Sequence, residues 1–317
     1  MRFHAQLLTG AIGVLILFLG TCEKSNPVDN NDPEPKPSFG TFLISLVAPE
    51  GTSSGYATVF GRVNDGPTPI GIIWNEKAAI GNCRLLTPEA PDCEGPCGGN
   101  ALCVEGDTCQ SFPSPVYVGK VTVNGVKTTD GDATFTMDTL RWNYQRSSNI
   151  AYPPFDEGDI ITVSTAGGTP FTLTVKGISP LEILTDSIVL EDNKPVTIQW
   201  TPSNVANNST ISITVDISHH GGTAGIIECE CPDDGSVTIP APLIDQLKAL
   251  GYFGWPKIEF TRRTVARDSA TGVELAIESK ITKYVQIPGL ISCDENEDCP
   301  EGQICEFFRC KDTTVTK

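Results

Sequence analysis

Apolar and polar residues alternate along most of the chain between residues 41 and 287, which is the pattern of half-buried β-strands. The alternation is clearest in VTIQW (196–200), STISITVDI (209–217) and GVELAIESKITKYVQI (272–287). We expect the apolar positions of these segments to face a core. They are Val196, Ile198, Trp200, Ile211, Ile213, Val215, Ile217, Val273, Leu275, Ile277, Ile281 and Val285.

Shorter alternating segments predict further strands. They are TFLISLVA (41–48), ATVFGRV (57–63), IGIIW (70–74), YVGKVTV (117–123), DIITVST (159–165) and FTLTVKG (171–177). One helix is predicted at APLIDQLKALG (241–251), which begins near Pro242 and stops at Gly251. Its apolar stripe is Leu243, Ile244, Leu247 and Leu250.

Many short strands with turn signals between them, and a single short helix, predict an all-β protein. We expect antiparallel immunoglobulin-like β-sandwich domains with one short helix and small disulfide-rich segments. A boundary is predicted near Ser179-Pro180, which gives a β-rich domain at 39–180 and an immunoglobulin-like sandwich at 181–289. A Cys-rich insertion at 83–112 and a Cys-rich disulfide segment at 290–317 complete the division.

The start of the chain has the features of an export signal. Residues 1–22 combine a basic residue, Arg2, with an apolar stretch from Leu7 to Leu19. The end of this segment, LGTC, resembles a bacterial lipobox, which implies acylation of Cys22. Residues 23–38 are rich in Pro, Asp and Asn and predict a solvated tether. A soluble secreted protein is the alternative; by resemblance to sorted lipoproteins, Glu23 favours the outer membrane.

The charge of the chain excludes one class of partner. Lys and Arg total 22 against 39 Asp and Glu, for a net charge of −17. Because nucleic-acid binding depends on Lys and Arg neutralising phosphates, no nucleic-acid partner is expected. The membrane is expected to be reached through the lipid anchor instead.

Eleven cysteines remain when Cys22 is assigned to lipid. They are Cys83, Cys93, Cys97, Cys103, Cys109, Cys229, Cys231, Cys293, Cys299, Cys305 and Cys310. An exported chain predicts disulfides, with zinc as the alternative. The first cluster holds five cysteines and needs an outside partner. One of Cys229 and Cys231 is expected to supply it, which leaves the other as the single free thiol.

The last cluster, CDENEDCPEGQICEFFRC, resembles a small Cys-rich signature of secreted and surface proteins, including many myxobacterial lipoproteins. The resemblance implies pairing of the first cysteine with the third and the second with the fourth. CEGPCGGNALCVEGDTC looks like a degenerate copy. The string from TIQWTPSN to IPAPLIDQL, with its DDGS turn, resembles a module of uncharacterised myxobacterial-type (deltaproteobacterial) lipoproteins. That resemblance, over about 115–310, implies architecture and compartment but no activity.

The stretch DISHHGGTAGIIECEC (216–231) is the strongest candidate for metal chemistry. With residues 221–225 as a hairpin loop, Ile217 lies opposite Cys229, and His219 and His220 point to opposite faces. At most one histidine and one or two thiols converge, so no metal and no cofactor are expected. His219 and Cys229 remain weak metal candidates, and a metal-dependent hydrolase remains a minor alternative.

Aromatic residues in polar loops are candidates for ligand binding. Trp142 and Tyr144 lie in LRWNYQRSSNIAYPPF, and Tyr252 and Trp255 lie in GYFGWP. We expect no catalytic residues and therefore a non-enzymatic, lipid-anchored envelope or surface protein that serves binding, adhesion or structural assembly. A carbohydrate-binding module protein is the alternative. Its expected partners are a surface protein or a glycan, and its expected place is the outer membrane, facing the periplasm or the surface.

Overall fold

The computed structural model describes residues 39–49, 52–146, 149–167, 170–218, 222–252 and 254–313. The predicted signal and tether, Cys22, His219 and His220 lie outside these residues. Within them, no helix combines the length and apolar character that a membrane crossing requires.

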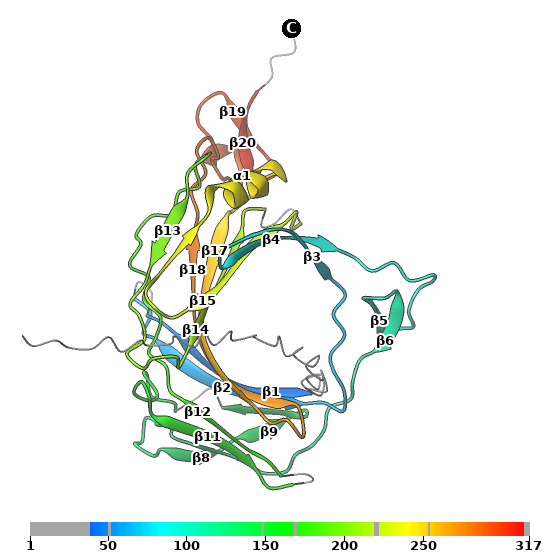
Figure 1. The fold of residues 1–317 in the computed structure, drawn as a ribbon, viewed down its shortest axis with the longest axis vertical. Coiled ribbons are helices and arrows are strands. Elements are labelled where there is room, and N and C mark those ends of the chain that lie inside the picture. Colours follow the sequence, from blue (N-terminus) through cyan, green and yellow to red (C-terminus); the bar gives the residue numbers. More distant parts are fainter. Residues whose placement is uncertain are drawn as a thin grey trace, which may run out of the picture. The chain divides into compact units, whose positions relative to one another are not determined.

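Ten strands form the largest sheet, in the order β3-β4-β15-β14-β17-β18-β1-β2-β10-β9 (Figure 1). Their bounds are β1 Gly40–Val47, β2 Tyr56–Val63, β3 Ile73–Ile80, β4 Cys83–Glu89, β9 Asp138–Leu140, β10 Asn143–Arg146, β14 Thr210–Asp216, β15 Ile226–Pro232, β17 Lys257–Arg267 and β18 Val273–Tyr284. The predicted antiparallel pairing holds within this sheet except between β1 and β18, which run parallel from Gly40↔Val273 to Val47↔Lys280. A parallel contact between strands so distant in sequence has no local sequence signal.

A first hydrophobic core lies between part of this sheet and a second one. The second sheet has the order β12-β11-β7-β8, with bounds β7 Val121–Asn124, β8 Thr134–Thr136, β11 Ile160–Thr165 and β12 Thr172–Lys176. Apolar side chains of β1, β2 and β18 meet those of this four-stranded sheet in one buried cluster. Two sheets packed through their apolar faces form a β-sandwich.

A second core fills the space between β4, β15, β14 and β17 and the elements that cover them. These are the hairpin of β13 (Val196–Gln199) with β16 (Ser236–Ile239), and α1 (Ala241–Ala249). Ile178 belongs to the first core and Leu181 to the second, so the chain passes from one core to the other between these residues. The domain boundary at 180 stays a prediction, because strands on either side of it share the ten-stranded sheet.

Two short hairpins and one 3₁₀ helix form the small Cys-rich parts. β5 (Ala101–Val104) pairs with β6 (Thr108–Ser111), and β19 (Gln303–Glu306) pairs with β20 (Arg309–Asp312) after the 3₁₀ helix η1 (Asn296–Asp298). The predicted fold class is confirmed: the described residues are all-β sandwiches with one α-helix and small disulfide-rich segments.

The apolar faces predicted from alternation are also confirmed, and most of their side chains are fully buried. Helix α1 buries Leu243, Ile244 and Leu247. Leu250 was predicted on the same stripe, but 41 % of it is exposed because the helix has ended and Leu250 is its C-cap. The strand predicted at 70–74 begins at Ile73.

The register predicted for the β14–β15 hairpin is wrong. Cys229 lies opposite Ile213 rather than Ile217, because the loop is longer than five residues. Ser218 explains the longer loop: its backbone N–H donates to the Asp216 side chain (3.0 Å), and its hydroxyl accepts the N–H of Ala224 (3.1 Å). These local bonds end the strand at Asp216. The predicted inner face is nevertheless correct, because Cys229 and Cys231 are buried.

Candidate functional site

Tyr144 is not available to a ligand, which corrects its selection as a binding residue. It faces the first core from β10, with none of its surface exposed. Its hydroxyl oxygen accepts the backbone N–H of Val118 at 2.8 Å. Burial raises the pKa of Tyr144 and outweighs the opposite effect of that hydrogen bond.

Trp142 occupies the tip of the β9–β10 hairpin. Arg141 and Trp142 have φ values of 48° and 71°, so both adopt the left-handed conformation of a tight two-residue turn. This conformation turns the indole outward, and 56 % of Trp142 is exposed. Trp142 therefore lies at a hairpin tip, far in sequence from Tyr252 and Trp255, and its neighbour Tyr144 is buried.

Trp255 lies at an aromatic groove in the second sandwich. Its ring packs against that of Tyr284, with centroids 5.9 Å apart and planes tilted by 57°. Tyr284 is the last residue of β18 and is 73 % exposed. The groove has a volume of about 480 Å³ and is also lined by Val189, Pro256, Val285, Gln286, Ile287, Pro288, Leu290 and Ser292.

Tyr284 was not among the aromatic residues predicted from the sequence to bind a ligand. Val285 next to it belongs to the predicted inner face, and the alternation therefore places Tyr284 outward. The sequence signal that could have identified Tyr284 is an outward-facing aromatic residue at a strand end, with a tryptophan in a nearby loop. The half-buried ring of Trp255 and the exposed ring of Tyr284 beside a groove provide an apolar platform with polar groups at its rim.

Tyr252 borders a second hollow of about 540 Å³, which shares Pro288 with the aromatic groove. Its other lining residues are Glu191, Asp192, Asp245, Lys248 and Ala249. Lys248 forms an ion pair with Asp192, and Asp245 accepts the backbone N–H of Asn193 at 2.9 Å. Lys194 pairs with Glu191 at 2.6 Å, so two lysines accompany three carboxylates and the surface beside the groove keeps a net negative charge.

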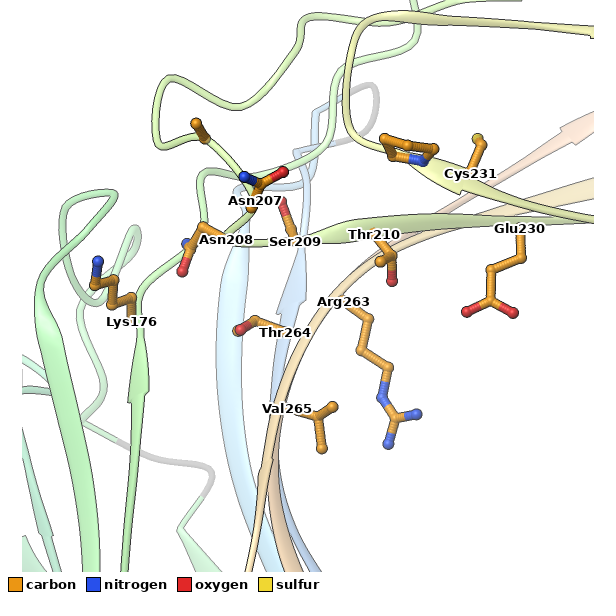
Figure 2. A pocket seen from close by; sticks show the side chains of 12 residues that line it. Lys176, Asn207, Asn208, Ser209, Thr210, Glu230, Cys231, Arg263, Thr264 and Val265 are labelled. Atoms are coloured by element: carbon orange, nitrogen blue, oxygen red, sulfur yellow. The ribbon is translucent and has the colours of Figure 1, made fainter. Parts of the chain in front are cut away.

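The largest of these hollows, about 670 Å³, lies where β12, β14, β15 and β17 come together (Figure 2). Three of its polar side chains bond to neighbouring groups. Asn208 donates to the Gly177 carbonyl (2.9 Å), Ser209 donates to Asp233 (2.6 Å), and Arg263 pairs with Glu274 (2.8 Å). These contacts hold the surrounding strands together.

Cys231 also lines this hollow, but its thiol is almost inaccessible, with 3 % of the residue exposed. Burial, aided by the nearby carboxylates of Asp234, Asp233 and Glu230, raises the pKa of Cys231 to about 11. The thiol is therefore protonated at neutral pH and is a poor nucleophile.

Cys83 and Cys229 form a disulfide that joins residues 146 positions apart, from the neighbouring strands β4 and β15. Cys231 is the free cysteine of the described residues. This confirms the predicted pairing of one member of the Cys229/Cys231 pair with the first cluster. It also corrects the weak metal assignment of Cys229, because a disulfide sulfur has no thiolate to offer a metal.

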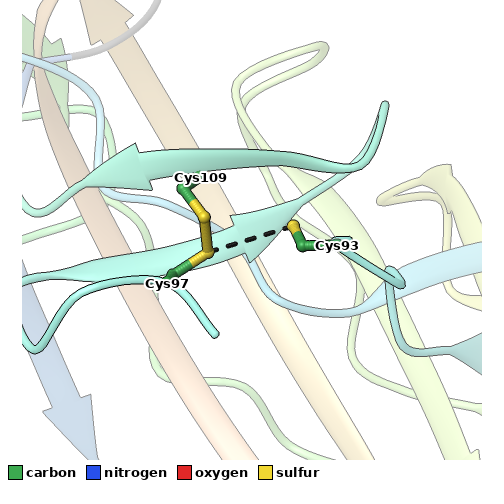
Figure 3. A group of neighbouring side chains, drawn as sticks. All are labelled: Cys93, Cys97 and Cys109. Carbon is green, nitrogen blue, oxygen red and sulfur yellow. Dashed lines mark hydrogen bonds between the residues drawn. A yellow bond between two sulfur atoms is a disulfide. The ribbon is translucent and has the colours of Figure 1, made fainter. Parts of the chain in front are cut away.

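The C-terminal Cys-rich segment has the pairing that its resemblance implied, and the first cluster, for which no internal pairing was predicted, shows the same order. The bonds are Cys93–Cys103, Cys97–Cys109, Cys293–Cys305 and Cys299–Cys310. Cys97 and Cys93 belong to different bonds, yet their sulfurs are 3.9 Å apart (Figure 3). Such dense cross-linking stabilises segments that have little apolar core of their own.

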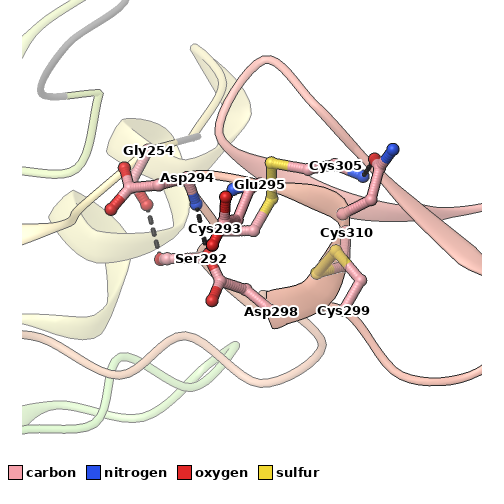
Figure 4. Close-up of a disulfide and its surroundings, with 10 residues drawn as sticks. Gly254, Ser292, Cys293, Asp294, Glu295, Asp298, Cys299, Cys305 and Cys310 are labelled. Atoms are coloured by element: carbon pink, nitrogen blue, oxygen red, sulfur yellow. Dashed lines mark hydrogen bonds between the residues drawn. A yellow bond between two sulfur atoms is a disulfide. The ribbon is translucent and has the colours of Figure 1, made fainter.

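The C-terminal Cys-rich segment is attached beside the aromatic groove, which Ser292 lines. The Ser292 hydroxyl, next to Cys293, donates to the Gly254 carbonyl at 2.6 Å (Figure 4), and Gly254 directly precedes Trp255. Within the segment, Asp298 accepts the N–H groups of Asp294 and Glu295, and these bonds lower the pKa of Asp298. The acidic run CDENED thus serves as a turn, with Asp298 satisfying backbone donors.

Comparison with known proteins gives little further information. No protein-family model matches the chain, and no curated protein matches it. Among solved structures, the FN1–FN3 domains of chicken CNTN1 align over 75 % of this chain and 83 % of theirs, at 7 % identity and a TM-score of 0.21. A TM-score this low does not show a shared fold. The description of the architecture therefore depends on the strand pairings and the two cores.

Proposed function

We propose that this protein is a non-enzymatic, lipid-anchored protein of the cell envelope that binds a surface glycan in the Trp255–Tyr284 groove. The observation that carries the proposal is the pair of rings beside this groove, with Tyr284 exposed and Trp255 half-buried against it. Sugars present apolar C–H faces that stack on aromatic rings, and hydroxyl groups that need polar partners at the rim. The exposed amide of Gln286 lies on the same groove and provides both a donor and an acceptor.

The charge around the groove favours a neutral or amino-bearing glycan. Glu191, Asp192 and Asp245 lie in the adjoining hollow, where Lys194 pairs with Glu191 and Lys248 with Asp192, which leaves one carboxylate in excess. An anionic polysaccharide would approach these carboxylates at a cost, which is screened only in part at physiological salt. A neutral hexose or N-acetylhexosamine chain carries no such cost.

The proposed anchor is Cys22, followed by the tether of residues 23–38. Several acyl chains on one cysteine give stable attachment, and the tether separates the folded part from the bilayer. Mass spectrometry of the mature chain tests the anchor: a diacylglyceryl adduct on an N-terminal Cys22 is expected. An unmodified N-terminus would refute the anchor but would leave the groove proposal intact.

An array of linear hexaoses of glucose, galactose and N-acetylglucosamine tests the groove, with the full chain in detergent as the probe. Binding to one neutral or amino-bearing series, with loss in Trp255→Ala and retention in Trp142→Ala, is expected. Trp142 is the matched control because it is an exposed tryptophan at a hairpin tip. No binding to any series, or equal loss in both variants, would refute a glycan site at this groove.

A further inference from the structure

Strand β3 is one edge of the ten-stranded sheet and pairs with β4 on one side only. Among the described residues, its other side has no strand partner. An edge of eight residues exposes a row of backbone N–H and C=O groups that can pair with another strand. Trp74 and Ile80, both on β3, are each 40 % exposed.

The sequence of β3, IWNEKAAI, is complementary to itself when read in the antiparallel direction. If Glu76 lies opposite Lys77 of a second copy, the same register sets Trp74 opposite Ala79 and Ile73 opposite Ile80. Opposite charges then meet at the centre, and a large side chain meets a small one on either side. The opposite-charge pair is of a stabilising type.

A twofold axis perpendicular to the sheet requires paired residues to lie on the same face of it. In a regular strand, positions 74 and 79 point to opposite faces. Here the register with β4 shifts between Glu76 and Ala78, so Lys77 is the extra residue of a bulge. Trp74 and Ala79 therefore lie opposite Pro88 and Arg84, two β4 residues on one face. The bulge makes the self-complementary register compatible with twofold symmetry.

We propose that two copies of this chain pair through β3 in an antiparallel arrangement, with Glu76 of each copy opposite Lys77 of the other. The two ten-stranded sheets then continue into one another across the axis. Charges and bulges at a sheet edge commonly prevent such pairing. In β3 the two charges have opposite signs at the two central positions, so they attract across the axis instead of repelling.

Sedimentation equilibrium of the full chain in detergent, at concentrations from about 1 to about 100 µM, tests the pairing, since so small an interface is expected to be weak. A monomer–dimer equilibrium is expected. Glu76→Lys and Lys77→Glu each create two like-charge pairs per dimer and should raise the dimer dissociation constant about tenfold. The double variant Glu76→Lys/Lys77→Glu restores opposite charges and should return it to within about threefold of the original.

Glu105→Lys is the matched control, because Glu105 is an exposed acid in the turn between β5 and β6. It changes the net charge as Glu76→Lys does and should leave the equilibrium unchanged. A monomer throughout the concentration range would overturn the proposal. So would a dimer that Glu76→Lys weakens no more than Glu105→Lys, or one that the double variant fails to restore.

Discussion

The guanidinium Nε of Arg262 lies 2.6 Å from Oδ2 of Asp233, and both side chains are buried, with 1 % and 3 % of their surfaces exposed. Nη2 of Arg262 donates to the other carboxylate oxygen (2.9 Å) and to the Thr201 carbonyl (2.5 Å). Asp233 also accepts the indole N–H of Trp200 at 2.8 Å and the Ser209 hydroxyl at 2.6 Å. The acidic DDGS turn is thereby held against the core tryptophan.

Arg262 also holds the segment between the two cores. Its Nη1 donates to the side-chain and carbonyl oxygens of Ser179, at 2.9 and 3.2 Å. Two residues later, the backbone N–H of Leu181 donates to the Ser279 hydroxyl (2.9 Å). One buried cation therefore ties together the junction, a turn and the sheet.

Removal of one partner of this buried pair should be severely destabilising. Arg262→Met leaves Asp233 buried without its cation and should cost about 3–5 kcal/mol of unfolding free energy, whereas Arg262→Met/Asp233→Leu should cost much less. Guanidinium denaturation followed by tryptophan fluorescence measures both. Glu228→Gln, which breaks the exposed Arg84–Glu228 pair, is the control and should cost less than about 1 kcal/mol. If Arg262→Met lowered the unfolding free energy as little as the control does, the stabilising role of the buried Arg262–Asp233 pair would be contradicted.

The thiol of Cys231 should resist labelling in the folded protein. With a pKa of about 11 and a buried position, it should not react with a maleimide at pH 8. Denaturation without reductant should expose one thiol per chain if Cys22 is acylated, and two if Cys22 is free. Rapid labelling of the native protein, or a larger number of thiols, would contradict the disulfide assignment.

Glu157 should make stability depend on pH. Burial alone would raise its pKa, but hydrogen bonds from Ser203, Asn204 and the Val205 backbone outweigh burial and hold the pKa below the ordinary 4.5. The stabilisation is therefore complete above about pH 4.5 and is lost as the pH falls through the lowered pKa. Denaturation of the wild type and Glu157→Gln between pH 3 and 7 should show a difference that is largest at pH 7. A difference in unfolding free energy that grows towards acid pH would contradict the lowered pKa of Glu157.

Gly61 is required by the rings on either side of it. In the sheet it lies opposite Phe42 on one side and Tyr144 on the other. A Cβ atom at this position would come within 2.3 Å of the Phe42 ring. Gly61→Ala should therefore lower the unfolding free energy by about 1–3 kcal/mol. Gly99→Ala, where a Cβ would meet nothing within 4 Å, is the control in the same denaturation experiment, and equal effects would contradict the packing described.

The alternation of apolar residues and the number of cysteines predicted the features of the fold that depend on local sequence. Alternation identified the buried faces of β14 and β18, and cysteine counting predicted a bond from the first cluster to Cys229 or Cys231, of which the structure has Cys229. The parallel pairing of β1 with β18 brings together residues more than two hundred positions apart and has no local signal. The hairpin register failed because Ser218 closes a longer loop through its own hydrogen bonds.

The alternation of apolar and polar positions also predicts the burial of a charged residue, Arg262. Arg262 continues the apolar face of Ile258 and Phe260, so its position predicts burial although its charge suggests exposure. A partner such as Asp233 lies in another turn and cannot be assigned from spacing. Tyr144 and Trp142, only two residues apart, have opposite exposure because a tight turn ends at Trp142.

Calorimetric titration of the groove with the hexaose that binds best tests the proposed function most directly. The measurement compares the full wild-type chain with Trp255→Ala, Tyr284→Ala and the control Trp142→Ala. Loss of a stacking ring should weaken binding at least about tenfold in the two groove variants, with no change in the control. Equal affinities in all four proteins would contradict a ligand site at Trp255 and Tyr284.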